Sequence, residues 1–306
     1  MEGTRATDAS DIPAGNWVDR LAPAPARPYL RLARLDRPIG TWLLLLPGWW
    51  SIALASSGWP DLRLLALFAI GAVVMRGAGC TANDMADRDF DARVARTATR
   101  PIPSAQVTVT QAAAFMVLLL AVGLLVLLQF NTFAIAVGAA SLILVAVYPF
   151  MKRITYWPQA WLGLTFNWGA LLGWAAVRGD LAAPAIVLYA AGLFWTLGYD
   201  TIYAHQDKHD DALIGVKSTA LKLGEQTRSW LLVFYGLAIA LLALSGFLAR
   251  LAWPFYAALV LAALHFGWQA LSVMIDDQKD CLAKFKSNRD VGLILFAGLV
   301  AGRIVA

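Results

Sequence analysis

The sequence predicts an all-α integral membrane protein in which nine helices cross the bilayer around a central cavity. The chain has 306 residues, of which 59% are hydrophobic and only 15% are charged. Soluble domains are nearer half apolar and about a quarter charged. Long apolar runs recur from residue 38 to the end of the chain. Their length and continuity favour helices over the short alternating strands of a membrane barrel.

Each apolar run is close to the roughly 20 residues that a helix needs to cross a bilayer. Arg289, Asp290 and Arg303 lie near the ends of the last run. No change of composition separates the runs, so we expect residues 29–306 to form a single membrane domain. We place the nine spans at residues 38–57, 62–82, 107–129, 131–149, 157–177, 182–202, 228–249, 252–274 and 289–306.

The distribution of lysine and arginine sets the orientation of the predicted spans. Twenty of the 25 basic residues fall in segments on one side of the membrane. The loops on the other side carry only Arg63, Arg178 and Arg250. This asymmetry places the N-terminus and both acidic clusters described below in the cytoplasm. It also accounts for the sequence pI of about 9.3 without a nucleic-acid partner.

The first residues have the composition of a polar tail. They include no apolar core, which argues against a secretory signal, and a mitochondrial transit peptide is usually poor in acidic residues. We therefore expect residues 1–28 to be a disordered cytoplasmic tail in a protein of a bacterial inner (plasma) membrane. Residues 28–37 look amphipathic and are expected to lie along the membrane surface. The acidic residues of the tail are Glu2, Asp8, Asp11 and Asp19.

The first acidic cluster follows the second span, and carboxylates at a membrane boundary are costly. On a helix with about 100° per residue, Asn83, Asp84, Asp87 and Asp91 share one face. Asp89 points to the other side, so we expect it to be a solvated charge. The pattern therefore predicts four oxygen-bearing side chains on a common face.

The second acidic cluster follows the sixth span, and its members Asp200, Tyr203, Asp207, Asp210 and Asp211 also share a helical face. Aspartates in like position in the two clusters are about 120 residues apart, which hints at an old duplication. Mg²⁺ binds through one or two carboxylates together with substrate phosphates. Two facing clusters would suit one or two such ions bridged by a diphosphate. No His or Cys pair has the spacing of a zinc site.

Two other interpretations of the acidic clusters stay open. The clusters could be polar helix ends, or they could line a path for cations, although such a path would place acids at mid-membrane. Basic residues accompany both clusters, and basic side chains are the usual partners of phosphate oxygens. Each one alone could also be a topology signal. As a set they favour an anionic substrate, and they are Arg96, Arg100, Lys152, Arg153 and Lys217.

At these residues the chain resembles the UbiA family of membrane prenyltransferases. The family signature Asn-Asp-x-x-Asp-x-x-x-Asp is matched at residues 83–91, and the Arg-x-x-x-Arg-Pro that follows is matched at residues 96–101. A second motif, Asp-x-x-x-Asp preceded by Tyr, is matched at residues 203–211. The resemblance runs from about residue 30 to the end of the chain. Stretches that resemble the 4-hydroxybenzoate polyprenyltransferase branch are residues 36–40, 148–159, 198–204 and 285–288.

The resemblance implies transfer of a polyprenyl group from a polyprenyl diphosphate to the ring of 4-hydroxybenzoate, ortho to its hydroxyl, as in ubiquinone biosynthesis. Mg²⁺ and basic side chains would hold the diphosphate and stabilise the charge that grows on it as it leaves. Apolar walls would keep water from the allylic cation. The expected catalytic residues are Asp87, Asp91, Asp207 and Asp211. The expected metal ligands are these four together with Asn83 and Asp84.

Two further residues are assigned to the acceptor. Arg37, at the cytoplasmic start of the first span, is a candidate for binding the acceptor carboxylate, and Tyr203 belongs to the second motif. Arg37 could equally be a snorkelling topology signal. Three alternatives remain: a prenyltransferase with another acceptor such as a naphthoate, homogentisate or haem, an ion-coupled transporter, and a lipid diphosphate phosphatase.

Overall fold

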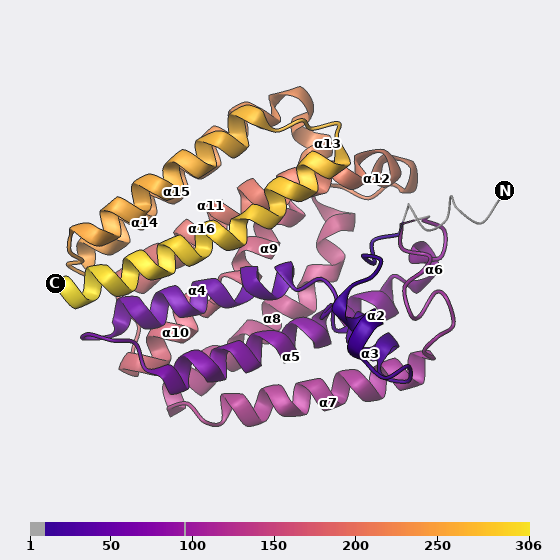
Figure 1. The fold of residues 1–306 in the computed structure, drawn as a ribbon, viewed down its shortest axis with the longest axis horizontal. Coiled ribbons are helices and arrows are strands. Elements are labelled where there is room, and N and C mark those ends of the chain that lie inside the picture. The colour runs from indigo at the N-terminus through magenta and orange to yellow at the C-terminus, as the bar shows by residue number, and fades with distance from the viewer. Residues whose placement is uncertain (1–9, 95) are drawn as a thin grey trace. The chain divides into compact units, whose positions relative to one another are not determined.

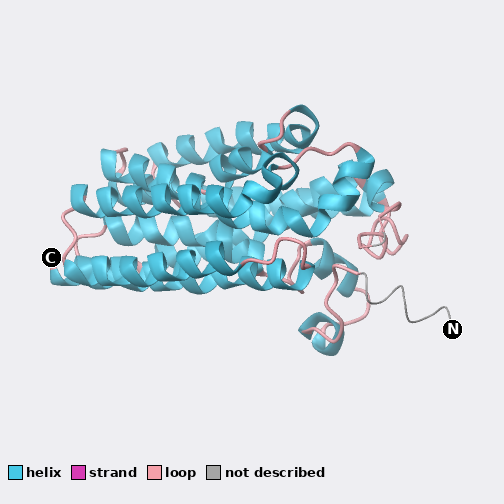
Figure 2. Cartoon of the chain, turned by 90° about the horizontal axis from the view of Figure 1, so that it is seen from above, coloured by secondary structure: helices cyan, strands magenta, loops and turns pink. Residues whose placement is uncertain are grey.

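The structure is a computed structural model that describes residues 10–94 and 96–306. The described residues form helices joined by loops and turns, and they include no β-strand (Figure 2). The predicted all-α fold class is therefore confirmed.

The chain divides into two compact units. Unit 1 consists of Met1–Thr41 and Ala69–Gln129, and unit 2 consists of Trp42–Phe68 and Phe130–Ala306. Two of the boundaries between the units fall inside α4 (Ile39–Ala55) and α5 (Leu62–Ala86), and a single membrane domain over residues 29–306 stays a prediction.

The N-terminal segment of unit 1 contains two short helices, α2 (Trp17–Leu21) and α3 (Arg27–Leu32). Asn16 caps α2, because its side chain accepts hydrogen bonds from two backbone N–H groups of the first turn. The indole Nε1 of Trp17 donates to the carbonyl oxygen of Leu35 at 2.7 Å. These bonds fix the segment, so the prediction of a disordered tail is wrong for residues 10–28. Residues 1–9 lie outside the described residues.

The rest of unit 1 builds on an apolar contact between its N-terminal helices and a later segment. Leu32 of α3 packs with Ile102 and Ala112 in one buried cluster. Thr108 and Gln111 form a capping box, which is a local sequence reason for a helix to begin there. The remaining helices of unit 1 are most of α5 (Leu62–Ala86), α6 (Arg88–Asp91) and α7 (Val109–Leu127).

Unit 2 is a bundle of long apolar helices. Helix α11 packs against α9, α14 and α16, and α15 packs against α14 and α16. Figure 1 shows α14, α15 and α16 side by side, in orange to yellow. The bounds are α4 (Ile39–Ala55), α8 (Thr132–Ile154), α9 (Pro158–Phe166), α10 (Trp168–Arg178), α11 (Ala183–Ala204), η1 (His205–Asp207), α12 (Lys208–Ile214), α13 (Thr219–Leu223), η2 (Gly224–Gln226), α14 (Thr227–Leu248), α15 (Trp253–Ser272) and α16 (Gln278–Val305).

The fifth predicted span, residues 157–177, is two helices rather than one. Asn167 lies between α9 and α10 and bounds both of them. Its Nδ2 donates to the carbonyl oxygen of Gly163 and to Oγ1 of Thr196, both at 2.8 Å. A side-chain amide that bonds to the carbonyl of the preceding turn competes with the helical backbone pattern. This competition explains the break.

Nine spans are not confirmed, because only six helices among the described residues are long and apolar enough to cross a membrane. Helix α4 has 17 residues and is shorter than each of these six helices. Helix α16, which contains the ninth predicted span, carries several charged residues in its first half. The six helices are Leu62–Ala86, Val109–Leu127, Thr132–Ile154, Ala183–Asp207, Thr219–Leu248 and Trp253–Ser272.

Helices α7 and α8 have the exposure expected of helices that face lipid. Only 11% of the most apolar window of α7 and 17% of that of α8 are buried inside the protein, at mean hydropathies of 2.4 and 2.2. Leu125 of α7 and Ile143 of α8 are among the exposed apolar side chains. Exposed apolar surface on this scale marks contact with a membrane or another apolar partner.

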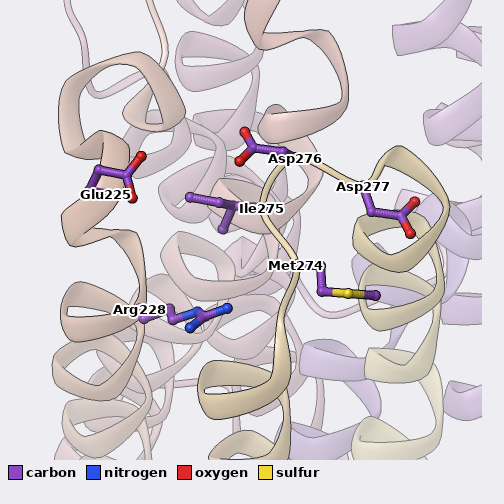
Figure 3. Close-up of a pocket in the computed structure, with 6 residues that line it drawn as sticks. All are labelled: Glu225, Arg228, Met274, Ile275, Asp276 and Asp277. Carbon is purple, nitrogen blue, oxygen red and sulfur yellow. The ribbon is translucent and has the colours of Figure 1, made fainter.

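A pocket of about 440 Å³ opens in unit 2, between the start of α14 and the loop that joins α15 to α16 (Figure 3). The guanidinium of Arg228 lies at its wall and donates to the carbonyl oxygen of Val273. None of the residues predicted for the site lines this pocket. The lining residues are Glu225, Arg228, Met274, Ile275, Asp276 and Asp277.

Candidate functional site

The first acidic cluster lies where α5 ends and α6 begins. Asp87 stands between the two helices with φ −100° and ψ 7°. The backbone N–H of Asp87 donates to the carbonyl oxygen of Asn83, and that of Asp91 donates to the carbonyl oxygen of Asp87. The helical spacing therefore continues through the break. Asp84, Asp87 and Asp91 are buried, whereas the side chain of Asp89 is 79% exposed, as the helical-face prediction expects.

Asp84 is fully buried and is held by two arginines. Its Oδ1 accepts from Nη2 of Arg34 at 2.6 Å and from Nη1 of Arg100 at 3.2 Å. Its Oδ2 is also buried, and nothing in the described part of the chain donates to it. A buried oxygen without a hydrogen bond is costly unless another group satisfies it. A bound cation is one such group.

Arg100 joins the carboxylates of this cluster. Its Nη1 contacts Asp84 and also donates to Oδ2 of Asp91 at 2.9 Å. Burial on its own would lower the pKa of Arg100, but the carboxylates of Asp11, Asp84 and Asp91 raise it above its usual range. Burial raises the pKa of Asp91, and the charge of Arg100 offsets that effect only in part. The guanidinium therefore stays charged, and a cation near Asp91 would favour its ionised form.

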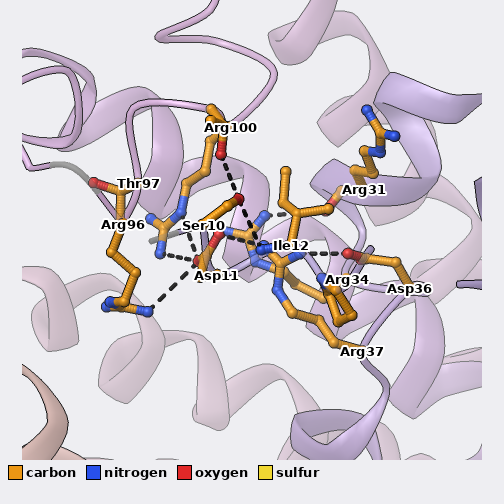
Figure 4. A network of polar contacts seen from close by, with 12 residues as sticks. Ser10, Asp11, Ile12, Arg31, Arg34, Asp36, Arg37, Arg96, Thr97 and Arg100 are labelled. Carbon is orange, nitrogen blue, oxygen red and sulfur yellow. Dashed lines mark hydrogen bonds and ion pairs between the residues drawn. The ribbon is translucent and has the colours of Figure 1, made fainter. Parts of the chain in front are cut away.

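A carboxylate from the N-terminal segment enters the same group. Asp11 accepts hydrogen bonds from Arg100 through Nε at 3.1 Å and Nη2 at 2.8 Å (Figure 4). Arg37 Nη2 lies 3.3 Å from the other Asp11 oxygen, and Arg96 Nη1 lies 3.7 Å from Oδ2. Burial alone would raise the pKa of Asp11, but the guanidinium groups of Arg100 and Arg37 outweigh burial and lower it. Three of the predicted anion-binding arginines thus converge on one carboxylate.

Arg37 is paired with its neighbour as well. Its Nη1 donates to Oδ2 of Asp36, and both side chains are largely buried. Burial and the nearby charge of Arg34 lower the pKa of Arg37, although the carboxylates of Asp11 and Asp36 counter them. Arg37 therefore contacts carboxylates in the structure, and binding of a carboxylate, that of the acceptor, is the role that the sequence predicts for it.

Sequence reasoning missed Asp11, Arg34 and Asp36. Asp11 makes its contacts with residues 26 and 89 positions away, and no local pattern indicates them. Arg34 and Asp36 lie in the stretch that was interpreted as a surface amphipathic helix. A signal was present there, because the stretch just before the first span carries an arginine at every third position, Arg31, Arg34 and Arg37, with Asp36 beside the last of them.

In unit 2, the second acidic cluster repeats the local geometry of the first. Helix α11 ends at Ala204, and Asp207 precedes α12 with φ −107° and ψ 4°, close to the angles of Asp87. Asp211 follows one turn later in α12. Two acidic motifs that each break a helix at an aspartate in the same way fit the duplication that the sequence hinted at. The side chain of Asp210 lies outside the described residues.

The other predicted residues of unit 2 lie near the ends of its helices. The ring of Tyr203 packs against that of Phe285, with centroids 4.5 Å apart. The backbone N–H of Lys217 donates to the carbonyl oxygen of Lys152 at 2.9 Å, and its ammonium donates to that of Ile154 at 3.2 Å. Lys217 therefore lies beside the segment that contains Lys152 and Arg153.

The donor set fits a hard divalent cation. In the described part of the chain, no three side chains of His, Cys, Asp or Glu are close enough to hold a metal ion by themselves. Mg²⁺ commonly takes only one or two carboxylates from the protein and completes its shell with water and substrate phosphate. The oxygen side chains around Asp84, with its buried Oδ2, suit that mode of binding.

A model of the UbiA prenyltransferase family matches residues 44–296 of the chain. A relative from Arabidopsis thaliana named "4-hydroxybenzoate polyprenyltransferase, mitochondrial" is 52% identical over 301 residues, which are 97% of this chain and 74% of that protein. A relative from Rattus norvegicus with the same name is 52% identical over 305 residues, which are 99% of this chain and 81% of that protein.

Solved structures share the fold. The apo structure of a UbiA homolog from Aeropyrum pernix K1 has a TM-score of 0.72 and 25% identity, and covers 85% of this chain and 97% of its own. A UbiA homolog from Archaeoglobus fulgidus bound to GPP and Mg²⁺ has a TM-score of 0.64 and 18% identity, and covers 91% of this chain and 100% of its own.

The names of the relatives correct one prediction. We expected a bacterial inner membrane, because acidic residues near the N-terminus argue against a transit peptide. Relatives from a plant and from animals that are about half identical over nearly the whole chain are named as mitochondrial enzymes, which contradicts the predicted bacterial location. With the family model covering most of the chain, and with both signature motifs present in order, the chain belongs to the UbiA prenyltransferase family.

Proposed function

We propose that this protein transfers a polyprenyl group from a polyprenyl diphosphate to the ring of 4-hydroxybenzoate, ortho to the hydroxyl, with release of diphosphate. The observation that carries the proposal is the buried group of carboxylates and guanidiniums around Asp84 and Arg100, at the end of an apolar helix. Ionisable groups in a membrane domain commonly mark a functional site, and buried ion pairs are weak evidence for a role in stability. The names of the relatives supply the substrates.

Mg²⁺ is the metal that this proposal requires. Bound to the carboxylates of the acidic clusters, Mg²⁺ would place positive charge beside the diphosphate oxygens as negative charge grows on them. The proposed metal ligands of unit 1 are Asn83, Asp84, Asp87 and Asp91, and those of unit 2 are Asp207 and Asp211. The structure of the Archaeoglobus homolog, which was solved with GPP and Mg²⁺, supports this choice.

The chain's own cations would orient the leaving group. Guanidinium groups bind phosphate oxygens through paired, charge-assisted hydrogen bonds. Stabilising the leaving diphosphate more strongly than the bound substrate lowers the barrier to ionisation. We assign this role to Arg96, Arg100, Lys152, Arg153 and Lys217, and we assign binding of the acceptor to Arg37 and Tyr203. We further propose that α4, the pair α9 and α10, and α16 cross the membrane together with the six helices named above.

The experiment is a product analysis. Membranes that contain the protein are incubated with Mg²⁺, mixed prenyl diphosphates and a panel of aromatic acceptors, and the lipid products are identified by mass spectrometry. We expect prenylated 4-hydroxybenzoate, in an amount that falls sharply for Asp91→Asn and stays near the wild-type level for Asp89→Asn. Prenylation of a different acceptor would replace 4-hydroxybenzoate in the proposal, and release of diphosphate without any acceptor would overturn it.

A further inference from the structure

The N-terminal strap, which we define as residues 10–15, carries a carboxylate into a cluster of guanidinium groups. The four arginines of this cluster are Arg34, Arg37, Arg96 and Arg100, and Figure 4 shows them around Asp11. The side chain of Asp11 is only 9% exposed, and it forms ion pairs with three of the four. Its two oxygens take the positions on the guanidiniums that an oxygen of a phosphate or a carboxylate would need.

The strap is seated by specific bonds on both sides of the carboxylate. The backbone N–H of Asp11 donates to the carbonyl oxygen of Arg96 at 2.9 Å. The hydroxyl of Ser10 lies 2.6 Å from that of Thr99. The strap therefore holds one defined position, in which the Asp11 carboxylate faces the arginine cluster.

The bonds that seat the strap are polar and Ile12 is not fully buried, so the strap can leave without opening an apolar core. Ser10 and Ile12 are only partly buried, and the three residues after Ile12 are exposed. Gly15 has φ +66°, a conformation that glycine adopts at little cost and that suits a hinge. Beyond the hinge, α2 is fixed, because Val18 is fully buried and Trp17 bonds to Leu35. Segments with few buried apolar contacts open at the lowest free energy.

Other carboxylates already serve part of the cluster. Arg34 is paired with Asp84, Arg37 with Asp36, and Arg100 with Asp84 and Asp91. Of the carboxylates paired with the cluster, Asp11 is the one that comes from a segment with a glycine at its end and no fully buried apolar side chain. It is therefore the carboxylate that can be exchanged for a ligand without dismantling α3, α5 or α6.

We propose that Asp11 is a built-in competitor of the substrate anion, and that the N-terminal strap must leave the arginine cluster before that anion binds. This inference rests on the proposed function, because it takes Arg37, Arg96 and Arg100 as the groups that receive the anion. The anion that displaces Asp11 has at least two charged oxygens, and both the diphosphate and the carboxylate of the acceptor meet that description.

The first test measures binding without turnover. Full-length protein in detergent with Mg²⁺ is titrated calorimetrically with inorganic pyrophosphate and, separately, with 4-hydroxybenzoate. We expect Asp11→Asn to bind at least one of the two anions about tenfold more tightly than the wild type, since it loses charge-assisted bonds to the arginines. Asp19→Asn, in the same segment but paired with Arg31 outside the cluster, should bind both as the wild type does. The anion that gains affinity identifies the ligand of the cluster.

Unchanged or weaker binding of both anions by Asp11→Asn would overturn the proposal, because a residue that merely positions the arginines would lower affinity when removed. A second variant tests the strap if Asp11→Asn does not fold. Ser10→Cys combined with Thr99→Cys places two thiols where the hydroxyls now meet, so oxidation should lock the strap in place. The oxidised variant should lose anion binding and recover it on reduction, and binding that is equal in both redox states would also overturn the proposal.

The outcome is separate from that of the proposed function. Tighter anion binding by Asp11→Asn in a protein that prenylates no aromatic acid would support the strap and overturn the enzyme assignment. Prenylation of 4-hydroxybenzoate by the wild type, together with unchanged anion binding by Asp11→Asn, would support the enzyme assignment and overturn the role of the strap.

Discussion

Arg34 donates a hydrogen bond to Oδ1 of Asp84 across 2.6 Å, and the two side chains are 10% and 0% exposed. Arg34 holds this position with φ +58°, a backbone conformation that side-chain-bearing residues rarely adopt. Strain of this kind persists only where the surroundings fix it. The guanidinium neutralises a carboxylate that has no access to water, so the pair fixes the first acidic cluster to the turn after α3.

We expect Arg34→Ala to lower the free energy of unfolding by about 3–5 kcal/mol, because it leaves the charge of Asp84 buried with only the longer contact to Arg100. The measurement is the thermal unfolding midpoint in detergent. The control is Arg31→Ala, whose partner Asp19 is 25% exposed, and which should cost no more than about 1 kcal/mol. Equal losses for the two variants would mean that burial does not make the Arg34 pair special.

Hydropathy located the helices because it depends on local sequence. The predicted spans 107–129 and 228–249 correspond to α7, Val109–Leu127, and α14, Thr227–Leu248. The break at Asn167 was missed because it depends on Thr196, which lies 29 positions away and reaches Asn167 only in the folded bundle. The order of residues 10–28 was missed for a similar reason, because the hydrogen bonds that fix Asp11 and Trp17 reach residues far away in the sequence.

The burial pattern of the first acidic motif was predicted, because its residues lie on one stretch of helix. Helical spacing correctly separated the exposed Asp89 from the buried Asp84, Asp87 and Asp91. Asp11 could not be predicted, because nothing near it in the sequence indicates a contact with Arg100. Periodicity identifies a face, whereas the partner of that face is decided by tertiary structure.

The aspartates of the two motifs are expected to be needed for turnover. Asp87→Ala, Asp91→Ala, Asp207→Ala and Asp211→Ala should each reduce kcat at least about a hundredfold, as the loss of a group that stabilises developing charge does. Asp89→Ala should be nearly silent, because its side chain is exposed and paired only with Arg88 in the described contacts. Steady-state rates in nanodiscs provide the measurement. A loss at Asp89 as large as that at Asp87 would contradict the common face.

Activity is expected to depend on a divalent cation with a preference for oxygen ligands. EDTA should abolish turnover, Mg²⁺ should restore it, and Mn²⁺ should substitute in part, because the candidate ligands are carboxylate and amide oxygens. A second readout does not need turnover: Mg²⁺ should raise the unfolding midpoint of the wild type and have a smaller effect on Asp91→Ala. Full activity in EDTA would rule out the metal.

Asn167, at the break in the fifth span, lies so close to Gly192 that replacement of this glycine by alanine is expected to destabilise the protein. A Cβ atom at Gly192 of α11 would overlap with the side chain of Asn167. Gly192→Ala should therefore cost about 1–3 kcal/mol, because Asn167 must move and lose its bonds. Gly236 of α14 has no atom within 4 Å of the same position, so Gly236→Ala should be neutral or should stabilise the helix by up to about 1 kcal/mol. Unfolding midpoints of the two variants decide the matter, and equal shifts would argue against the close contact.

The acceptor carboxylate is expected to depend on Arg37 more than on any other cation of the cluster. Arg37 already lies beside two carboxylates, those of Asp36 and Asp11, so its guanidinium can pair with a carboxylate such as that of a small benzoate. Arg100, in contrast, is occupied by Asp84 and Asp91. An Arg–carboxylate pair is often bidentate, and lysine cannot reproduce that geometry.

We therefore expect Arg37→Ala, and to a lesser degree Arg37→Lys, to raise the KM for 4-hydroxybenzoate by about 10- to 150-fold, which corresponds to a charge-assisted hydrogen bond of roughly 1.5–3 kcal/mol. The KM for the prenyl diphosphate should stay the same or fall, because the variant also removes one of the three arginines that hold Asp11. Each substrate is titrated against a saturating partner in nanodiscs. If only the KM for the prenyl diphosphate rises, Arg37 belongs to the diphosphate site. If neither KM changes, Arg37 is a topology signal at the start of the first span.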